Sequence, residues 1–299
     1  MGTPTGPNAP VGVGVTVLAV RPHPDDESLA TGGLLASYSM RGVRTGVVTC
    51  TGGEEGEIHH AALDPGFNKA RLRDIREQEL RRACAILGVT DLRLLGYRDS
   101  GMANTPANTH PEAFAQADPV EAAGRLVRLI RELQPLVMVT EPPGGLYPHP
   151  DHVMCHRMSV HAFYAAADAR VYPEAGPAWQ VVKLYAAAHI DDGVWTALQP
   201  EFQAAGFEME ERLRLRARRA GPEIATVALD IRPYSSIQRR ALLAHRTQIP
   251  PGSLWARLPD DLYRRAFATA YFIRFYPPAA PGERESDLLD GLDATTGEQ

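Results

Sequence analysis

The sequence predicts an α/β protein with a Rossmann-like, mostly parallel sheet, helices on both faces, and a smaller C-terminal α+β elaboration. Two observations indicate this class: short apolar runs alternate with amphipathic helical segments, and polar corners directly follow several of the apolar runs. A third is size, because 299 residues with 44% apolar side chains can bury a substantial core. We expect the core to span residues 1–190 and the elaboration, which packs on it, to span residues 191–299.

Strands and helices are predicted in alternation along the first part of the chain. The apolar runs are short and continuous, as in strands covered on both faces, and the segments between them carry apolar residues at helical spacing. Gly42 and Gly88 supply helix C-caps, and Asp118 supplies an N-cap. In chain order we expect a strand at Val13–Val20, a helix at Glu27–Met40, a strand at Thr45–Thr51, a helix at Lys69–Leu87, a strand at Leu92–Leu95, a helix at Pro119–Leu133 and a strand at Leu136–Thr140.

The pattern continues for one more helix and strand and then becomes richer in arginine and glutamate. The same criteria of spacing and apolar run length apply here. We expect a helix from Asp151 to Ala167, a strand at Val181–Ala188, a helical stretch at Asp191–Ala220, a strand at Ile224–Ile231 and a helix at Tyr234–Thr247. The last segment, Pro277–Gln299, is rich in proline, glycine and acidic residues, and its end is expected to be a mobile tail.

Charge and hydropathy exclude several classes of partner. The formal net charge is −5, from 31 basic and 36 acidic residues, so the chain has no overall basic field for nucleic acid. No apolar run approaches the ~20 residues of a membrane span, and the opening residues lack the basic-then-apolar order of a signal peptide. The sequence therefore predicts a cytoplasmic protein with neither nucleic acid nor membrane as partner, and it leaves open whether the chain forms a homo-oligomer.

The three cysteines are scattered along the chain. Cys50, Cys84 and Cys155 have no CxxC spacing, which argues against a disulfide framework and against a thiolate metal site. Cys50 lies within a predicted strand and is expected in the core. Cys155 follows His152 by three residues, close enough in sequence to approach a site there.

Two short blocks hold imidazole and carboxylate groups between prolines, and each closely follows an apolar run. The first is His23-Pro24-Asp25-Asp26-Glu27, and the second runs from Tyr147 to His152. If the two preceding strands are parallel neighbours, their carboxyl ends face one crevice, where open α/β sheets bind ligands. Catalytic zinc favours three nitrogen or oxygen ligands and an open position. The candidate ligands and bases are His23, Asp25, Asp26, His149, Asp151 and His152.

Turn chemistry is the simpler explanation of either block taken alone. Proline and aspartate both favour strand-to-helix corners, and aspartate caps helices. Turn chemistry does not explain why histidine is repeated in the two blocks.

The glycine-rich loop Gly52–Glu57 is expected to line the site, but its three glutamates would repel phosphate, so it is not interpreted as a phosphate cradle. The aperiodic segment Ala103–Gln116 is expected to be a surface loop near the substrate.

On these two blocks the chain resembles the LmbE/PIG-L family of zinc-dependent N-acetylglucosamine deacetylases, whose signatures are His-Pro-Asp-Asp-Glu and a distant His-Pro-Asp-His. The similarity covers nearly the whole chain and is closest to an actinobacterial branch that contains the mycothiol-biosynthetic deacetylase and the mycothiol S-conjugate amidase. The stretches that carry it are Thr49–Ile58, Arg98–Met102, Arg131–His156, Pro173–Tyr185 and Ala244–Ile249.

The resemblance implies a role for each polar residue of the two blocks. His23, Asp26 and His152 would hold one Zn²⁺, although such a set also accepts Fe²⁺ or Co²⁺. Asp25 would be the general base that takes a proton from the attacking water. His149, oriented by Asp151, would donate to the oxyanion and protonate the leaving amine, and Tyr147 would help to polarise the carbonyl group.

Three further residues resemble family positions that contact the sugar or its aglycone: Arg76, Asp99 and Glu57. Each has a simpler alternative. Arg76 could pair with Glu79 on its own helix, and Glu57 could be a solvated charge in an acidic loop.

The expected substrate is a small-molecule N-acetylglucosaminyl conjugate of the kind used in low-molecular-weight thiol biosynthesis, hydrolysed to acetate and a free amine. One alternative is an amidase that cleaves the cysteinyl-glucosamine bond of thiol S-conjugates, although Ala30 stands where such amidases carry a lysine. Another is a non-catalytic sugar- or nucleotide-binding module. The sequence also departs from close relatives at Arg21-Pro22, which predicts an additional guanidinium beside the pocket.

Overall fold

One seven-stranded sheet organises the computed structural model, which describes residues 14–59, 69–188, 192–207 and 225–292. The strand order is β3-β2-β1-β4-β5-β7-β6. The first five strands pair in parallel, whereas β7 is antiparallel to both β5 and β6, so the predicted mostly parallel α/β class is confirmed. The strands are β1 Val17–Arg21, β2 Thr45–Thr51, β3 Asp91–Tyr97, β4 Val137–Thr140, β5 Lys183–Ala187, β6 Val227–Asp230 and β7 Thr269–Tyr276.

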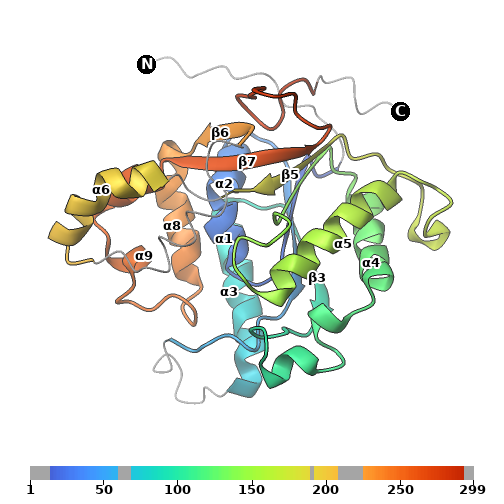
Figure 1. Cartoon of the computed structure of the whole chain (residues 1–299), viewed down its shortest axis with the longest axis horizontal. Coiled ribbons are helices and arrows are strands. Elements are labelled where there is room, and N and C mark those ends of the chain that lie inside the picture. The colour runs from blue at the N-terminus through green and yellow to red at the C-terminus, as the bar shows by residue number, and fades with distance from the viewer. Residues whose placement is uncertain (1–13, 60–68, 189–191, 208–224, 293–299) are drawn as a thin grey trace.

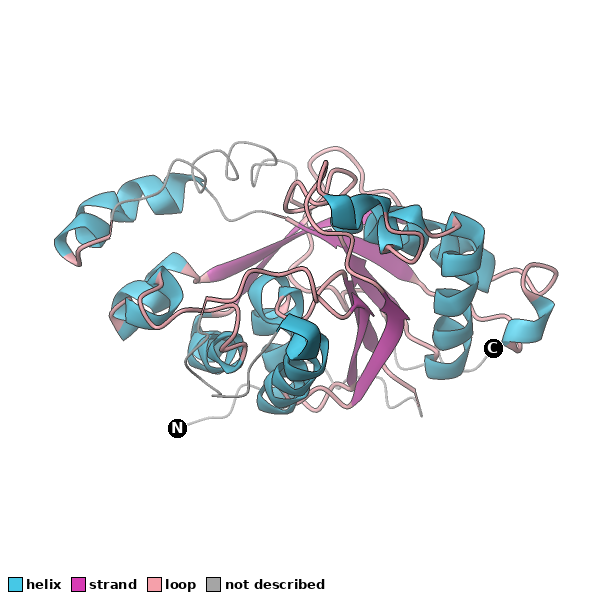
Figure 2. Ribbon diagram, turned by 90° about the horizontal axis from the view of Figure 1, so that it is seen from below, coloured by secondary structure: helices cyan, strands magenta, loops and turns pink. Residues whose placement is uncertain are grey.

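Helices cover both faces of this sheet (Figures 1 and 2). The α-helices are α1 Asp26–Ala30, α2 Gly32–Met40, α3 Leu72–Leu87, α4 Pro119–Leu133, α5 Pro150–Ala166, α6 Asp192–Ala204, α8 Ser235–Ala244, α9 Leu254–Arg257 and α10 Asp260–Ala266. Short 3-10 helices lie at Lys69–Arg71, Pro106–Thr109, Phe114–Gln116, Pro173–Ala175 and Arg232–Tyr234. Helices α4 and α5 pack together against one face, and α2, α3 and α8 pack on the other. None of the helices in the described ranges combines the length and the apolar character that a bilayer-spanning segment requires.

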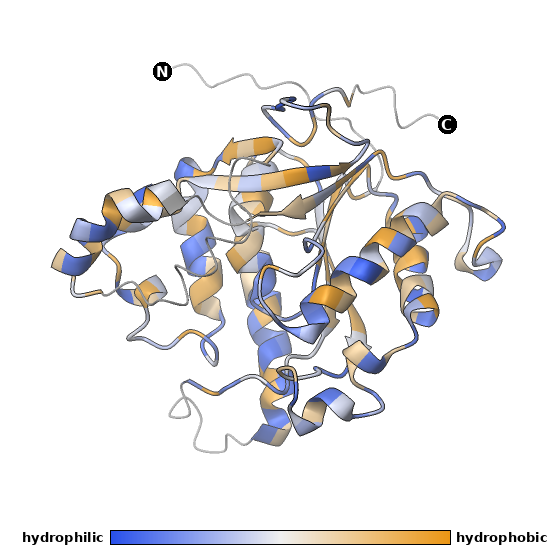
Figure 3. Cartoon of the chain, viewed as in Figure 1, coloured by the Kyte–Doolittle hydropathy of each residue, from blue (hydrophilic) through white to orange (hydrophobic). Residues whose placement is uncertain are grey.

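The core follows the apolar runs of the sequence (Figure 3). Strands β1, β2, β4 and β5 are buried along their whole length, which is why their sequences are mainly apolar and do not alternate between apolar and charged residues. Strand β2 and helix α4 have the predicted bounds, and the Asp118 side chain accepts from the backbone N–H groups of Val120 and Glu121, as an N-cap should.

The helix expected at Glu27–Met40 is instead two helices, α1 and α2, separated at Thr31. The apolar residues at helical spacing remain helical in α2, but the backbone leaves the helical conformation at Thr31, just before Gly32 and Gly33. A Cβ atom on Gly33 would lie 2.4 Å from Cδ1 of Ile231, so the glycine permits α2 to approach the end of β6 closely. The strand expected at Val13–Val20 begins later, at Val17, and Val13 lies outside the described residues.

Sequence patterning predicted no element between residues 248 and 276, where the structure has α9, α10 and β7. Strand β7 lies between β5 and β6, so residues on both sides of the predicted boundary at 190 belong to one sheet. Helix α6 confirms the start of the helical stretch expected from Asp191, whereas residues 208–220 of that stretch lie outside the described chain. The division at residue 190 stays a prediction.

Residues 277–292 pack against the sheet. Glu285 forms ion pairs with Lys183 (2.6 Å) and Arg274 (2.7 Å), and Asp287 accepts a hydrogen bond from Tyr38. Leu288 is fully buried beside them. The expected mobile end, residues 293–299, lies outside the described residues.

Strand β1 is the point at which the order of parallel strands reverses, since β2 lies on one side of it and β4 on the other. The register pairs Val17 with Val137 and Ala19 with Val139, so the two strands end at the same edge of the sheet. Ligands of doubly wound sheets bind at such a switch point. Here the corners after β1 and β4 are the two motif blocks.

Arg131, at the end of α4, holds the C-terminal end of α5 in place. Its buried guanidinium donates to the backbone carbonyl groups of Ala165, Ala166, Asp168, Val171, Tyr172 and Gly176, at 2.6 to 3.2 Å. A cation at a helix C-terminus also opposes the negative end of the helix dipole. Because the second motif block begins α5, this contact helps to position the site from the opposite end of the helix.

We predict that Arg131→Met lowers the free energy of unfolding by about 3 kcal/mol, because it leaves several buried carbonyl groups without donors. Urea unfolding followed by circular dichroism measures the change. Arg128→Met, which alters an exposed arginine of the same helix, is the matched control and should change stability by less than about 0.5 kcal/mol. Equal stabilities of the two variants would contradict this role of Arg131.

Candidate functional site

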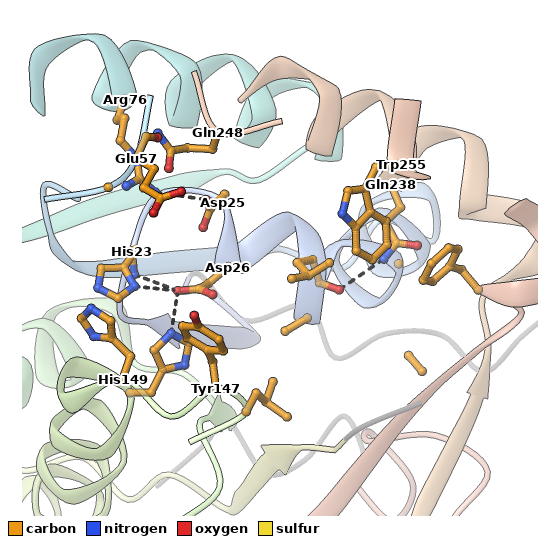
Figure 4. Close-up of a pocket in the computed structure, with 18 of the residues that line it drawn as sticks. His23, Asp25, Asp26, Glu57, Arg76, Tyr147, His149, Gln238, Gln248 and Trp255 are labelled. Carbon is orange, nitrogen blue, oxygen red and sulfur yellow. Dashed lines mark hydrogen bonds and ion pairs between the residues drawn. The ribbon is translucent and has the colours of Figure 1, made fainter. Parts of the chain in front are cut away.

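The two motif blocks meet at the carboxyl ends of β1 and β4. Oδ2 of Asp26 lies 3.3 Å from Nδ1 of His23 and 3.6 Å from Nε2 of His152 (Figure 4). All three residues are buried, and their candidate ligand atoms lie within 4.8 Å of one another. Two imidazole nitrogens and one carboxylate oxygen facing a common point are the donors that a catalytic divalent cation takes in proteins. The residues therefore fit a metal site.

The charge state of Asp26 suits a ligand. Burial alone would raise its pKa, but the His152 and His23 rings outweigh this effect and hold the pKa of Asp26 below its usual range. Oδ2 also accepts the backbone N–H of His23 at 3.0 Å, which fixes the carboxylate within its own corner.

His23 is shared with a second group of acidic side chains. Its Nε2 lies 3.2 Å from Oδ2 of Asp151 and 3.7 Å from Oδ1 of Asp99. Asp151 is itself held by the backbone N–H and the hydroxyl group of Ser100. Because the Nε2 hydrogen of His23 is engaged by Asp151, its Nδ1 remains available as the metal-binding nitrogen.

His152 is oriented by a carboxylate that the sequence analysis did not select. Nδ1 of His152 lies 2.9 Å from Oε2 of Glu141, the residue directly after β4. Arg21 forms an ion pair with the same carboxylate, and both side chains are completely buried. The expectation that Arg21 would place a guanidinium beside the pocket is therefore wrong: the side chain lies behind the ligand, where it compensates the buried charge of Glu141.

Asp25 occupies a backbone conformation that non-glycine residues rarely adopt, with φ of 117°. Its backbone N–H donates to Oε2 of Glu27 at 2.9 Å, and its side-chain Oδ2 pairs with Arg76 at 3.0 Å. Adjacent side chains on this turn diverge, so Asp26 joins the metal ligands while Asp25 faces Arg76. Burial raises the pKa of Asp25 to about 6, although Arg76 opposes the rise.

A buried ion pair supports this turn from behind. Oε1 of Glu27 lies 2.8 Å from Nε2 of His245, at the end of α8, and neither side chain is exposed to solvent. Burial opposes both charges, but their mutual attraction lowers the pKa of Glu27 and raises that of His245. Thr247 contacts Glu79 of α3 through its backbone N–H (2.9 Å) and its hydroxyl group (2.7 Å). The C-terminal segment thus holds α3 and the Asp25 turn together.

The orientation of His149 differs from the expectation. Its Nδ1 accepts the backbone N–H of Asp151 at 3.2 Å, whereas the Asp151 carboxylate is 3.9 Å away. Asp151 therefore orients His149 through the main chain and His23 through the carboxylate. Burial and the neighbouring His23 lower the pKa of His149 to about 4. The neutral ring, with Nδ1 accepting, carries its hydrogen on Nε2, which lies 3.7 Å from Oδ1 of Asp99.

A cavity of about 620 Å³ opens onto these groups. Tyr147, Arg76, Asp99 and Glu57 all line it, and Tyr147 lies edge-on to His152 with ring centroids 6.1 Å apart. Arg76 is buried and donates to the carbonyl groups of Pro24 and Gly53. It does not pair with Glu79, the alternative raised by the sequence. The Glu57 side chain is 87% exposed, so it lies at the rim.

The segment Ala103–Gln116 lies mainly at the surface, as predicted, apart from Ala113 and Phe114, which are buried in the core. Within the described chain, none of its residues lines the cavity, so its expected place beside the substrate is not supported. The Cys155 sulfur packs 3.9 Å from that of Cys50, and Cys155 does not line the cavity. Cys50 is a core residue, as predicted.

Sequence reasoning missed Glu141, Ser100 and His245 as supporting residues. The sequence did contain a signal for Glu141. This acidic residue directly follows the apolar strand β4, so it must lie at the edge of the sheet where the two motif blocks meet. For His245 no such signal existed, because its partner Glu27 is 218 residues away.

Comparison with known proteins identifies the family of the chain. The model of the PIG-L family, described as GlcNAc-PI de-N-acetylase, matches residues 18–163, which include both motif blocks. The chain is 40% identical over 290 residues to a 1D-myo-inositol 2-acetamido-2-deoxy-alpha-D-glucopyranoside deacetylase of Acidothermus cellulolyticus, covering 93% of this chain and 95% of the relative. It is 37% identical to a protein of the same name from Catenulispora acidiphila, covering 98% and 95%.

Solved structures share the fold at lower identity. N,N'-diacetylchitobiose deacetylase from Pyrococcus horikoshii matches with a TM-score of 0.60 and 18% identity, over 89% of this chain and 85% of the other. The 4-carboxy-2-hydroxymuconate hydratase GalB from Pseudomonas putida matches with a TM-score of 0.59 and 18% identity, over 89% and 98%. One fold thus serves two reactions, and the fold alone does not assign the chemistry. The family is assigned by the near-full-length relatives and the two motif blocks: the chain belongs to the PIG-L (LmbE-like) family.

Proposed function

We propose that this chain is a metal-dependent hydrolase that removes the acetyl group from an N-acetylglucosaminyl conjugate and releases acetate and a free amine. The observation that carries the proposal is that the buried set His23, Asp26 and His152 lies in one cavity with the carboxylate of Asp25, which pairs with Arg76 and is not one of the three candidate ligands. The named activity of the relatives, which match over nearly their whole length, supports the same reaction.

The metal is proposed to be one Zn²⁺ per chain. Two imidazoles and a carboxylate suit zinc, and the same set accepts Fe²⁺ or Co²⁺. When bound, such an ion supplies Lewis acidity, which polarises the amide carbonyl group and makes a water molecule easier to deprotonate near neutral pH. The chain contributes rigid ligands, since Glu141 fixes the His152 ring and Asp151 fixes the His23 ring.

Asp25 is proposed as the general base. Its carboxylate lines the cavity beside the ligands, and Arg76 holds it by one oxygen, which leaves the other oxygen to accept a proton from water. The backbone N–H of Asp25 donates to Glu27, which fixes the turn, and the ion pair with Arg76 orients the side chain. Asp25 gains one proton from the attacking water, and the leaving amine needs one proton. The same carboxyl group can therefore act first as the base and then as the acid.

His149 is proposed to donate a hydrogen bond from Nε2 to the carbonyl oxygen as negative charge develops there. A donor of this kind contributes on the order of 3 kcal/mol to transition-state binding. Its low pKa favours this neutral role over the proton transfer to the amine that the family resemblance implies. Tyr147, at the cavity wall, is proposed to assist in polarising the carbonyl group, and Asp99 and Arg76 to contact sugar hydroxyl groups.

The proposed substrate is a small molecule in which N-acetylglucosamine is joined to an inositol-like aglycone, by analogy with the named relatives. The amidase of thiol S-conjugates would use the same metal chemistry. Ala30, which lines the cavity, presents a methyl group at the position where a lysine is expected in that amidase, and this favours the deacetylase. A cytoplasmic location remains an expectation from the sequence.

The proposal predicts that the protein releases acetate from an N-acetylglucosaminyl-inositol faster than it cleaves a thiol-bimane conjugate. Chelator treatment should abolish acetate release, and one equivalent of Zn²⁺, Fe²⁺ or Co²⁺ should restore it, because the ligands are preformed. Acetate release that persists in metal-free protein would contradict the mechanism. Faster cleavage of the bimane conjugate would instead identify the amidase.

We also predict that Asp25→Asn lowers kcat for acetate release on the order of several hundred-fold, because it removes the general base but keeps the shape of the side chain. Metal content, measured in the same samples, should remain at one ion per chain. Asp74→Asn, which changes an exposed carboxylate on α3, is the matched control and should leave kcat unchanged. Trace hydrolysis of equal rate in the wild type and in Asp25→Asn would indicate a non-catalytic binding module.

A further inference from the structure

A short segment of the C-terminal part of the chain, residues 245–247, contacts both groups that support the proposed general base. The segment directly follows α8. Helix α8 packs on α1, which begins directly after Asp25, and on α3, which carries Arg76 (Figure 1). This packing places His245 beside Glu27, although the two residues are 218 positions apart in sequence.

The first support acts on the main chain of Asp25. Its φ of 117° is disfavoured for any residue with a Cβ atom, so surrounding contacts must maintain it. The backbone N–H of Asp25 donates to Oε2 of Glu27 at 2.9 Å. The other oxygen of that carboxylate, Oε1, lies 2.8 Å from Nε2 of His245 and accepts from the hydroxyl group of Ser28. Glu27 therefore links His245 to the backbone of the general base.

The second support acts on the side chain of Asp25, which pairs with Arg76 of α3 at 3.0 Å (Figure 4). Glu79 lies three residues further along the same helix. Its carboxylate accepts the backbone N–H of Thr247 at 2.9 Å and the hydroxyl group of Thr247 at 2.7 Å. Arg76 and Glu79 are both buried. Residues 245–247 thus hold the two elements that fix the main chain and the side chain of Asp25.

Glu27 and His245 lie out of reach of a substrate. Both side chains are completely buried, and within the described chain neither residue lines the cavity. Their ion pair adds little net stability, because the cost of removing two charges from water offsets their attraction. Loss of one partner is costly, since the other charge then stays buried without compensation. The pair is therefore better suited to fixing one conformation than to binding a ligand.

We infer that His245 is a positioning residue for the reaction: through Glu27 it holds the Asp25 turn in the orientation in which Asp25 accepts a proton from water. The inference rests on the proposed function, since it requires Asp25 to be the general base. Without His245, the Glu27 carboxylate loses its buried partner and no longer fixes the backbone N–H of Asp25. The turn can then relax, and the base leaves its working orientation.

The candidate metal ligands have supports of their own. Asp26 accepts the backbone N–H of His23 at 3.0 Å, and Glu141 orients the ring of His152. Loss of His245 should therefore reduce the rate of the chemical step and leave metal binding in place. This separation distinguishes a positioning residue from one that only maintains the fold.

The test is a double-mutant cycle on the metal-loaded, full-length protein, with acetate release from the N-acetylglucosaminyl-inositol as the reaction. His245→Leu should lower kcat about thirtyfold, which is part of the loss expected when the general base is removed, and should leave KM within about twofold. In the Asp25→Asn background the same substitution should lower kcat by less than about twofold, because the group that His245 positions is already absent. Metal content should remain at one ion per chain in all four proteins.

Further variants separate the contact with Glu27 from general stability. His245→Gln keeps an amide nitrogen that can donate to Glu27 and should retain most of the wild-type kcat, whereas the shorter side chain of His245→Asn should not. This comparison carries the test if His245→Leu folds poorly. Leu242→Ala, which removes buried apolar volume from α8 and alters neither member of the ion pair, is the matched control. It should lower the melting temperature and leave kcat within about twofold.

Two kinds of result would overturn the inference, and they differ from each other. The first is an equal fractional loss of kcat from His245→Leu in the wild-type and Asp25→Asn backgrounds, or an equal loss in Leu242→Ala. Either would assign His245 a general structural role and leave the proposed function intact. The second is hydrolysis by Asp25→Asn at the wild-type rate, which would remove the proposed function and the inference with it.

Discussion

The parallel pairing of β1 with β4 is the constraint on which the rest of the site depends. The candidate ligand set needs both corners, since His23 and Asp26 follow β1 and His152 follows β4. The shared register ends both strands at one edge of the sheet and brings Nε2 of His152 within 3.6 Å of Asp26, although the two residues are 126 positions apart in sequence. The reversal of strand order at β1 leaves room there for a cavity, because the following helices lie on opposite faces.

Several charged side chains are buried around this meeting point, and the structure pairs each of them with a partner. Glu141 lies between Arg21 and His152, Glu27 contacts His245, and Asp151 contacts His23 and Ser100. Such pairs contribute little net stability, because desolvation offsets their attraction, but removing one partner is costly. Their effect here is geometric: the ligand rings and the strained Asp25 turn are fixed by groups that cannot move without leaving a buried charge unpaired.

Much of this arrangement could be predicted from local sequence, and the remainder could not for definite physical reasons. The apolar run before the second block predicted β4, and the cap at Asp118 predicted α4. The two His-Pro-Asp blocks supplied six candidate ligands and bases, and the family resemblance selected His23, Asp26 and His152, which the structure brings together. The missed strand β7 has an aromatic-rich sequence, but its position between β5 and β6 follows from antiparallel pairing over a long loop. His245 has no local signature, because its position arises from the packing of α8 on the core. The helix expected at Glu27–Met40 divides at Thr31, and Gly33, just beyond the break, lets α2 approach Ile231 closely.

Anomalous diffraction at the zinc absorption edge, from crystals of the Zn²⁺-loaded protein, tests the central claim most directly. The account predicts one strong anomalous peak per chain, bonded to Nδ1 of His23, the Asp26 carboxylate and Nε2 of His152 at about 2.0–2.2 Å. A peak among His23, Asp99, His149 and Asp151, the other buried group of candidate ligands within the described chain, would contradict it, because the metal would then lie away from Asp26 and the assigned roles of Asp25 and His149 would fail.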